Sequence, residues 1–185
     1  GEKIQFVRPE RVDVVVRHSP IYCPYCGREL DLREDIDGGV CPACDELVVK
    51  QHTVAAHTLV FDGDRVLVVR RTAGRRQGTW GFPGGHAEVT ESPAETASRE
   101  LHEETRLAIA PSRLTLETIL HEQNPDGTVY LDVAYVGDRG DTSGELRPNE
   151  SEVSAAEFVP VGELGERSLF RDGDARRALS VYADR

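Results

Sequence analysis

Residues 84–107 constrain the fold more than any other segment, because they encode a glycine pair, a helix start and a row of acidic side chains. Ser92, Pro93 and Glu95 have the order of a capping box: an N-cap serine, a proline at the first helical position, and an acidic residue three positions after the cap. We therefore expect a helix that begins directly after Ser92. The apolar residues that recur at helical spacing and should pack it against a sheet are Ala94, Ala97 and Leu101.

Three glutamates of this helix, Glu100, Glu103 and Glu104, are spaced so that their carboxylates leave one helix face. They repel one another and have no lysine beside them. A hard divalent cation, which prefers oxygen ligands, would relieve that repulsion. A solvated acidic helix face is the alternative, and the three glutamates alone do not decide between the two.

The spacing of residues over the whole segment favours a bound cation over a solvated acidic face. Gly85, Glu91 and the run Arg99–Leu107 together resemble the signature motif of the Nudix hydrolases, and the approach in residues 78–85 is also similar to that family. The resemblance implies an α/β fold, a Nudix-type α/β/α sandwich with a mixed sheet. It also implies hydrolysis of a nucleoside diphosphate linked to another moiety, with Mg²⁺ or Mn²⁺ as the catalytic cofactor.

The same resemblance assigns roles to individual residues. Glu100, Glu103 and Glu104 would bind the metal, aided by a backbone carbonyl near Gly84 or Gly85, with Gly85 as our choice. Arg99 would pair with Glu91 or Glu103 and orient the ligands. Glu104 is one candidate for the general base, and a downstream loop offers Glu150 or Glu152 instead. The expected catalytic set is therefore Glu91, Arg99, Glu100, Glu103 and Glu104.

One position departs from the family pattern. Arg106 stands where the family normally has glycine, which follows the helix end in a left-handed conformation. We expect Arg106 to adopt a positive φ at a cost of about 1 kcal/mol. The departure removes no carboxylate.

The amino-terminal segment contains four cysteines in two C-x2-C pairs, Cys23/Cys26 and Cys41/Cys44. Two such pairs are typical of a zinc ribbon, in which four thiolates close the coordination shell and the metal is structural. Two disulfides, or iron in a rubredoxin-like site, are the alternatives. Strands are expected on both sides of the ribbon, at residues 12–16 and 47–49.

The net charge and the composition of the chain limit which molecules it is expected to bind. The chain of 185 residues has a net charge of −11, and only Lys3 and Lys50 of its 22 basic residues are lysine. An acidic protein is poorly suited to nonspecific nucleic-acid binding, and residues 27–40 between the cysteine pairs contain no aromatic side chain. High-salt adaptation and genomic base composition both explain the scarcity of lysine. A small-molecule nucleotide substrate is the expected partner, and a homodimer is compatible with the sequence.

The domain boundary is expected near residue 50, with a zinc ribbon and amino-terminal strand in residues 1–50 and a Nudix domain in 51–185. Beyond it, apolar runs predict strands at 54–61, 65–70, 114–122, 129–136 and 155–159, and a last helix capped by Asp174. No run of 18 apolar residues occurs and no signal-peptide-like segment is present at the amino terminus, so we expect a cytoplasmic protein without a membrane span.

Arginines gather just ahead of the acidic helix, at positions 70, 71, 75 and 76. Guanidinium groups match phosphate geometry, so Arg70, Arg75 and Arg76 are expected to contact a phosphorylated substrate. An ordinary solvated loop with salt bridges is the alternative.

The substrate itself stays open. A ribbon followed by a Nudix domain resembles the architecture of the NADH pyrophosphatases, but residues 108–117 contain no Ser-Gln-Pro-Trp-type motif of that subfamily. ADP-ribose, other nucleotide sugars, dinucleotides and noncanonical nucleoside triphosphates are all compatible. A nucleotide-binding sensor without hydrolytic activity is the alternative function, and a ribbon-led nucleic-acid adaptor is a third that the charge disfavours.

Overall fold

The computed structural model describes residues 19–72, 77–123, 127–166 and 174–185, so the strand expected at 12–16 lies outside the described residues. The chain divides into two compact units. The first comprises Gly1–Thr53 with Gln123–Val129, and the second comprises Val54–Glu122 with Tyr130–Arg185.

The first unit contains a three-stranded antiparallel sheet of β1 (Asp31–Arg33), β2 (Gly38–Val40) and β3 (Leu47–Val49). β3 is the strand that the sequence predicted on the carboxyl side of the cysteines. Its small core packs two apolar side chains, Leu30 and Val48, against the cysteines. Such a core buries little apolar area, so a metal cross-link is a physically reasonable source of stability.

The second unit is built on a seven-stranded sheet in which five strands follow the order β12-β5-β4-β10-β9, while β6 pairs with β5 and β7 pairs with β4. The strands are β4 (Thr53–Asp62), β5 (Arg65–Arg71), β6 (Trp80–Gly81), β7 (Gly84–His86), β9 (Thr115–Gln123), β10 (Val129–Asp138) and β12 (Val153–Pro160). A separate two-stranded pair joins β8 (Ala108–Ile109) to β11 (Thr142–Ser143).

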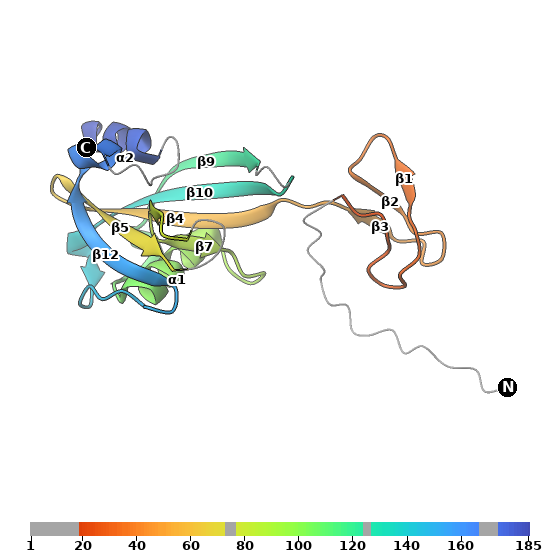
Figure 1. Cartoon of the computed structure of the whole chain (residues 1–185), viewed down its shortest axis with the longest axis horizontal. Helices are drawn as coiled ribbons and strands as arrows, with labels where there is room; N and C mark the ends of the chain where they lie inside the picture. The colour runs from red at the N-terminus through yellow and green to blue at the C-terminus, as the bar shows by residue number, and fades with distance from the viewer. Residues whose placement is uncertain (1–18, 73–76, 124–126, 167–173) are drawn as a thin grey trace. The chain divides into compact units, whose positions relative to one another are not determined.

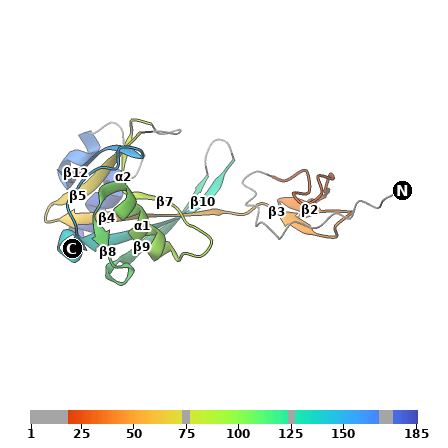
Figure 2. The same ribbon diagram turned by 90° about the horizontal axis from the view of Figure 1, so that it is seen from below.

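In the part of the chain that the structure describes, two α-helices cover this sheet, α1 (Pro93–Thr105) and α2 (Asp174–Ala183). Short 3-10 helices are η1 (Pro111–Arg113), η2 (Arg139–Asp141) and η3 (Val161–Glu166). In Figure 1, α1 lies below the sheet and α2 above it, and the view from below in Figure 2 shows α1 in front of the strands. The expected α/β/α sandwich is confirmed.

The sequences of the central strands explain why both faces are covered. β4 and β5 are nearly continuous apolar runs, and successive side chains of a strand point to opposite faces. Leu59 and Val68 therefore belong to the core that includes Ala178 of α2. Val60 and Leu67 belong to the core that includes Leu101 of α1. The sheet is thus a rigid layer on which α1 can be positioned.

The turn between β4 and β5 is the hairpin predicted from the sequence. Phe61 pairs with Val66 and Asp62 with Arg65 in antiparallel register, and Gly63 takes a φ of 59°. Among the described residues, no helix is long and apolar enough to cross a membrane.

Candidate metal centre and active site

The helix that carries the glutamates begins as its sequence predicts. The Ser92 hydroxyl accepts the backbone N–H of Glu95 at 3.3 Å, and the Glu95 carboxylate accepts the backbone N–H of Ser92 at 2.8 Å. This reciprocal capping box satisfies two amides that have no partner within the helix. It fixes the first turn of α1 and, with it, the direction in which the later glutamates project.

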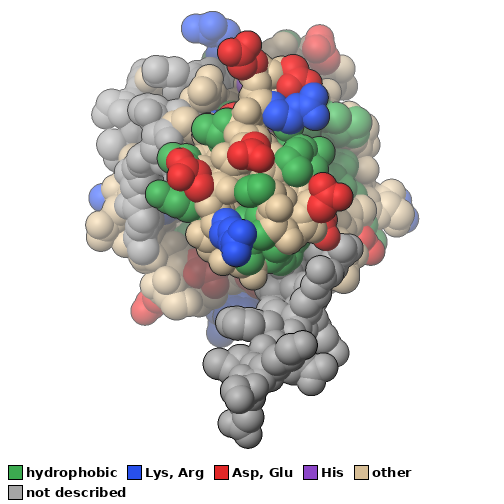
Figure 3. Space-filling model, turned by 90° about the vertical axis from the view of Figure 1, so that its right-hand side faces the viewer, with side chains coloured by type: hydrophobic (Ala, Val, Ile, Leu, Met, Phe, Trp, Pro, Cys, Tyr) green, Lys and Arg blue, Asp and Glu red, His purple; other side chains and the backbone are tan. Residues whose placement is uncertain are grey.

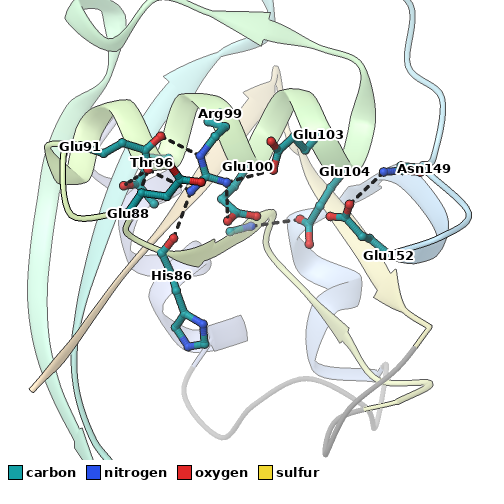
Figure 4. Close-up of polar contacts among 12 residues, drawn as sticks. His86, Glu88, Glu91, Thr96, Arg99, Glu100, Glu103, Glu104, Asn149 and Glu152 are labelled. Atoms are coloured by element: carbon teal, nitrogen blue, oxygen red, sulfur yellow. Dashed lines mark hydrogen bonds and ion pairs between the residues drawn. The ribbon is translucent and has the colours of Figure 1, made fainter. Parts of the chain in front are cut away.

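Arg99 is the hub of the ionic network on α1 (Figure 4). Its Nε donates to Glu91 Oε1 at 2.7 Å, and its Nη1 donates to Glu100 Oε1 at 2.8 Å and to Glu103 Oε2 at 2.9 Å. Nη2 also donates to the carbonyl of His86 at 3.0 Å. Arg99 thus pairs with both partners that the sequence offered, Glu91 and Glu103. One guanidinium group ties the loop before the helix to two carboxylates on it.

Glu91 is held on the other side of that guanidinium group. Its carboxylate also accepts the Thr96 hydroxyl at 3.1 Å and the backbone N–H of Glu88 at 3.2 Å. The hydrogen bonds from Arg99 lower the pKa of Glu91 to about 2. The pair is therefore ionised at any pH near neutrality, and Glu91 acts on Arg99 rather than pointing toward the other glutamates.

Three carboxylates come together in one place: Glu100, Glu103 and Glu152 have ligand oxygens that all lie within 4.8 Å of one another. Glu100 and Glu103 come from α1, and Glu152 comes from the loop before β12. Of the two loop glutamates that the sequence offered, Glu152 therefore lies with the helix carboxylates, whereas Glu150 is exposed and is not in this group.

Gly85 is necessary for this arrangement because the chain passes very close to a carboxylate there. A Cβ at Gly85 would lie 2.3 Å from Glu100 Oε1, well inside van der Waals contact. The carbonyl of the preceding residue, Gly84, accepts Arg71 Nη2 at 3.1 Å. The glycine pair therefore places backbone atoms directly beside the carboxylates.

Glu104 has a different environment from its neighbours on the helix. It is 3% exposed, and its Oε2 accepts the backbone N–H of Gly84 at 3.0 Å. Arg71 Nη1 lies 3.9 Å from Glu104 Oε1. Burial raises the pKa of Glu104 to about 7, against the opposing effect of the Arg71 charge. Glu104 thus borders the group of Glu100, Glu103 and Glu152 as a carboxylate that can hold or release a proton near neutral pH.

Burial also raises the pKa of Glu100, although Arg99 opposes the shift. Carboxylates whose ionisation is disfavoured by burial and by one another are stabilised in the charged form by a nearby cation. The electrostatics of the site therefore favour a bound divalent cation.

The arginine loop is only partly described. Arg75 and Arg76, which the sequence suggested as substrate contacts, lie outside the described residues. Arg70, near the end of β5, is exposed, and its Nε donates to the carbonyl of Gly78 at 3.1 Å. Arg71 is the arginine that reaches Glu104 and Gly84. The sequence contained Arg71 in the basic run but gave no reason to single it out.

The four cysteines of the ribbon lie together as their spacing predicts. The Sγ atoms of Cys23, Cys26, Cys41 and Cys44 lie within 4.8 Å of one another, and none forms a disulfide. Although burial acts in the opposite direction, backbone hydrogen bonds from Ala43 and Cys44 lower the pKa of Cys41 to about 7. The arrangement is consistent with a zinc ribbon.

Figure 3 shows how charged side chains are distributed on one face of the molecule. On the face drawn in Figure 3, the described Lys and Arg side chains are separated by acidic and apolar ones and form no continuous basic patch.

Comparison with known proteins identifies the family. The family model of the NUDIX domain matches residues 51–180. The putative mutator protein MutT4 of Mycobacterium tuberculosis is 32% identical over 146 residues, covering 72% of this chain and 55% of that protein. The putative ADP-ribose pyrophosphatase YjhB of Bacillus subtilis is 31% identical over 122 residues, covering 65% of this chain and 56% of that protein. The chain thus spans little more than half the length of these two relatives.

A crystal structure of a Nudix hydrolase from Nitrosomonas europaea shares the fold, with a TM-score of 0.65 and 20% identity over 89% of this chain and 91% of that one. The chain belongs to the Nudix hydrolase family, as the match over residues 51–180 establishes.

Proposed function

We propose that this chain is a divalent-metal-dependent pyrophosphohydrolase that cleaves a nucleoside diphosphate linked to another moiety. The observation that carries the proposal is the group formed by Glu100, Glu103 and Glu152, whose ligand oxygens lie within 4.8 Å of one another. Carboxylate oxygens are the donors that Mg²⁺ and Mn²⁺ prefer. Membership of the Nudix family supports the same activity.

Each residue has a physical role in this reaction. Glu100, Glu103 and Glu152 would hold the metal, together with a backbone carbonyl of the glycine pair, and Glu104 beside them would act either as a further ligand or as the general base. The bound ion would supply charge neutralisation for the diphosphate and a lower pKa for an attacking water. Arg99 keeps Glu100 and Glu103 in fixed positions, as a partner beyond the direct ligands does in many metal sites.

Two carboxylates are candidates for accepting the proton of the attacking water. Glu104 has one oxygen, Oε1, that is not bonded to Gly84, and burial brings its pKa to about 7. Glu152 is exposed at the edge of the group. General bases work best when their pKa lies near the operating pH, which favours Glu104.

For the substrate, we propose ADP-ribose or a related nucleotide sugar as the first candidate. The relative from Bacillus subtilis is described as a putative ADP-ribose pyrophosphatase. NADH is not expected to be strongly preferred, because the Ser-Gln-Pro-Trp-type motif is missing from residues 108–117. Arg71 faces the site and Arg70, Arg75 and Arg76 precede it, so this loop is the expected contact for the phosphates.

The runner-up is a nucleotide-binding sensor that does not hydrolyse its ligand. A panel of NADH, ADP-ribose, a diadenosine polyphosphate and nucleoside triphosphates, assayed with Mg²⁺ and with Mn²⁺, separates the two functions. We expect hydrolysis of at least one compound, and binding without product release would favour the sensor. A preference for NADH of about 100-fold, or about 2.7 kcal/mol, would show that the ribbon architecture predicts the substrate better than the missing motif does.

Substitutions then test the site. Glu103→Gln and Glu104→Gln should each lower kcat by about 100-fold or more, since each keeps the shape and removes the charge. Glu152→Gln should also lower kcat, whereas Glu150→Gln, in the same loop, is the matched control and should leave it unchanged. Near-normal rates in the first two variants at saturating Mg²⁺ would refute the metal-site assignment.

We further propose that the ribbon binds one structural Zn²⁺ through Cys23, Cys26, Cys41 and Cys44. Zinc prefers thiolate ligands, and four of them leave no position for a catalytic water. The Sγ atoms of the four cysteines lie within 4.8 Å of one another, which supports the proposal. Metal analysis after exhaustive dialysis should give about one zinc per chain, and reduced protein without bound transition metal would refute it.

A further inference from the structure

Asn149 connects the end of α1 to the loop that carries Glu152. It lies outside the motif at residues 85–107, so the motif does not predict this connection. Its backbone N–H donates to the carbonyl of Glu104 at 3.0 Å. Its side-chain Nδ2 donates to Glu152 Oε1 at 3.0 Å. Figure 4 shows the second of these bonds, with Glu152 directed toward Glu104 and the helix. A single residue therefore contacts both the helix and the loop carboxylate.

The end of α1 provides the acceptors for this connection. Arg106 adopts a left-handed conformation with a φ of 63°, which ends the helix and leaves the last carbonyls free of helical partners. The loop then supplies the missing donors: Arg147 N–H bonds to the carbonyl of Thr105 at 2.9 Å, and Asn149 N–H bonds to that of Glu104. The loop is fastened to the backbone of the residue whose side chain borders the carboxylate group.

The hydrogen-bonding partners determine which end of the Asn149 side-chain amide faces Glu152. A carboxylate accepts hydrogen bonds but cannot donate them when ionised, so the NH₂ end must face Glu152. The oxygen end then accepts the Ser151 hydroxyl at 2.8 Å. Both ends of the amide have a suitable partner, which holds its orientation and, through it, that of the Glu152 carboxylate.

The far side of the loop is fastened to the sheet. The Thr72 N–H donates to the carbonyl of Glu152 at 3.0 Å, and the Thr72 hydroxyl donates to the same carbonyl at 2.7 Å. These bonds fix the Glu152 backbone but leave its side chain free to rotate. Among the described residues, Asn149 makes the side-chain hydrogen bond to Glu152 that selects one carboxylate position.

We propose that Asn149 is a positioning residue that holds the Glu152 carboxylate within reach of Glu100 and Glu103 and so completes the metal site. This inference rests on the proposed function. Because Glu152 is exposed, the carboxylate would otherwise sample several rotamers, and the site would spend only part of its time complete.

The test is a set of variants assayed for Mn²⁺ affinity by electron paramagnetic resonance and for kcat and KM. Asn149→Ala should weaken Mn²⁺ binding and lower kcat by about 10-fold, the low end of the range for residues that orient metal ligands. Asn149→Asp, which has the same size but no donor and adds a negative charge, should lose at least as much. Arg147→Ala is the control, because its side chain pairs with Glu145 at the surface and its backbone bond remains.

A double-variant cycle separates positioning from a general structural role. If Asn149 acts through Glu152, then Asn149→Ala should cause no further loss of Mn²⁺ affinity in the Glu152→Gln background. The proposal would be overturned if Asn149→Ala caused an equal loss of Mn²⁺ affinity in both backgrounds. It would also be overturned if Asn149→Ala kept Mn²⁺ affinity and kcat within about 2-fold of the parent. Glu100→Gln tests the metal site separately: normal Mn²⁺ binding in that variant would refute the proposed function, whereas its loss beside an unaffected Asn149→Ala would refute the positioning role alone.

Discussion

Alanine substitutions at the adjacent glycines Gly84 and Gly85 should have different effects. Gly84→Ala should mainly lower stability, whereas Gly85→Ala should mainly lower metal binding and turnover. At Gly85 a Cβ would meet Glu100 Oε1 at 2.3 Å, where ordinary contact begins at 3.4 Å. The carboxylate must therefore withdraw by about 1 Å, and it can do so because it is the end of a flexible side chain. The rotamer change should cost only about 1 kcal/mol of stability. A misplacement of about 1 Å at a catalytic group can lower the rate by about 100-fold.

At Gly84 the obstacle is backbone rather than side chain. The Cβ would lie 2.4 Å from the carbonyl oxygen of Ala56 and 2.6 Å from the Cα of His57. Both atoms belong to β4, which pairs with β7 at this point. Relief requires the two strands to separate, so Gly84→Ala should cost about 3 kcal/mol, the upper end for overpacking. In a chain of this length that corresponds to a fall in Tm of about 6 °C or more.

Thermal unfolding, Mn²⁺ binding and hydrolysis should be measured on both variants. Gly85→Ala should retain nearly the parent Tm but lose Mn²⁺ affinity and turnover, while Gly84→Ala should be mainly a stability variant. Gly81→Ala is the control in the same segment, since a Cβ there meets nothing within 4 Å. Normal metal binding and turnover in Gly85→Ala would refute the placement of Glu100 beside the backbone, and an unchanged Tm in Gly84→Ala would refute the close approach of β7 to β4.

Three further outcomes are expected. Arg106→Gly should raise the free energy of unfolding by up to about 1 kcal/mol in urea denaturation, because glycine adopts the observed φ of 63° without strain; a less stable variant would contradict this. Since Arg99 lowers the pKa of Glu91 to about 2, the ion pair contributes stability that is fully present above the usual carboxyl pKa of 4.5 and is lost as the pH falls through about 2. Glu91→Gln should therefore lower stability at neutral pH by about 1–2 kcal/mol and reduce the loss on acidification, and parallel urea midpoints of both proteins down to acid pH would argue against the pair. Strong chelation should unfold the ribbon but leave the second unit folded, as measured by hydrogen exchange, and full protection of β1–β3 after metal removal would exclude a structural zinc.

Local signals explain why much of the second unit could be predicted. The capping box at Ser92 and the turn at Gly63 act through neighbours in the chain, so their residue types specify the backbone directly. The positive φ of Arg106 was predicted instead from the resemblance to the Nudix motif, in which a glycine in the left-handed conformation normally follows the helix end. The pair β8–β11 could not be predicted in this way, because strands of two residues have no periodicity and depend on distant partners.

The choice between loop glutamates shows where local information ends. Glu150 and Glu152 have the same side chain, lie two residues apart and are both exposed. Glu152 faces the helix because Thr72, which directly follows β5, holds its carbonyl and Asn149 holds its carboxylate. Neither contact produces a periodic pattern of residue types in the sequence. A nearby Asn or Ser at short spacing is the only signal that could have favoured Glu152.

The glutamates of α1 also show, within one helix, that local sequence does not determine the environment of a side chain. The spacing of Glu100, Glu103 and Glu104 predicts one shared helix face, but residues on one face can have different environments. The Glu103 side chain is 44% exposed and Glu104 is 3% exposed, although they are adjacent. Glu104 accepts the backbone N–H of Gly84, whereas Glu103 accepts a hydrogen bond from the Arg99 side chain. A pattern of charges can therefore identify a candidate ligand set, whereas the difference between an exposed carboxylate and a buried one with a pKa raised to about 7 depends on the strand packed against the helix.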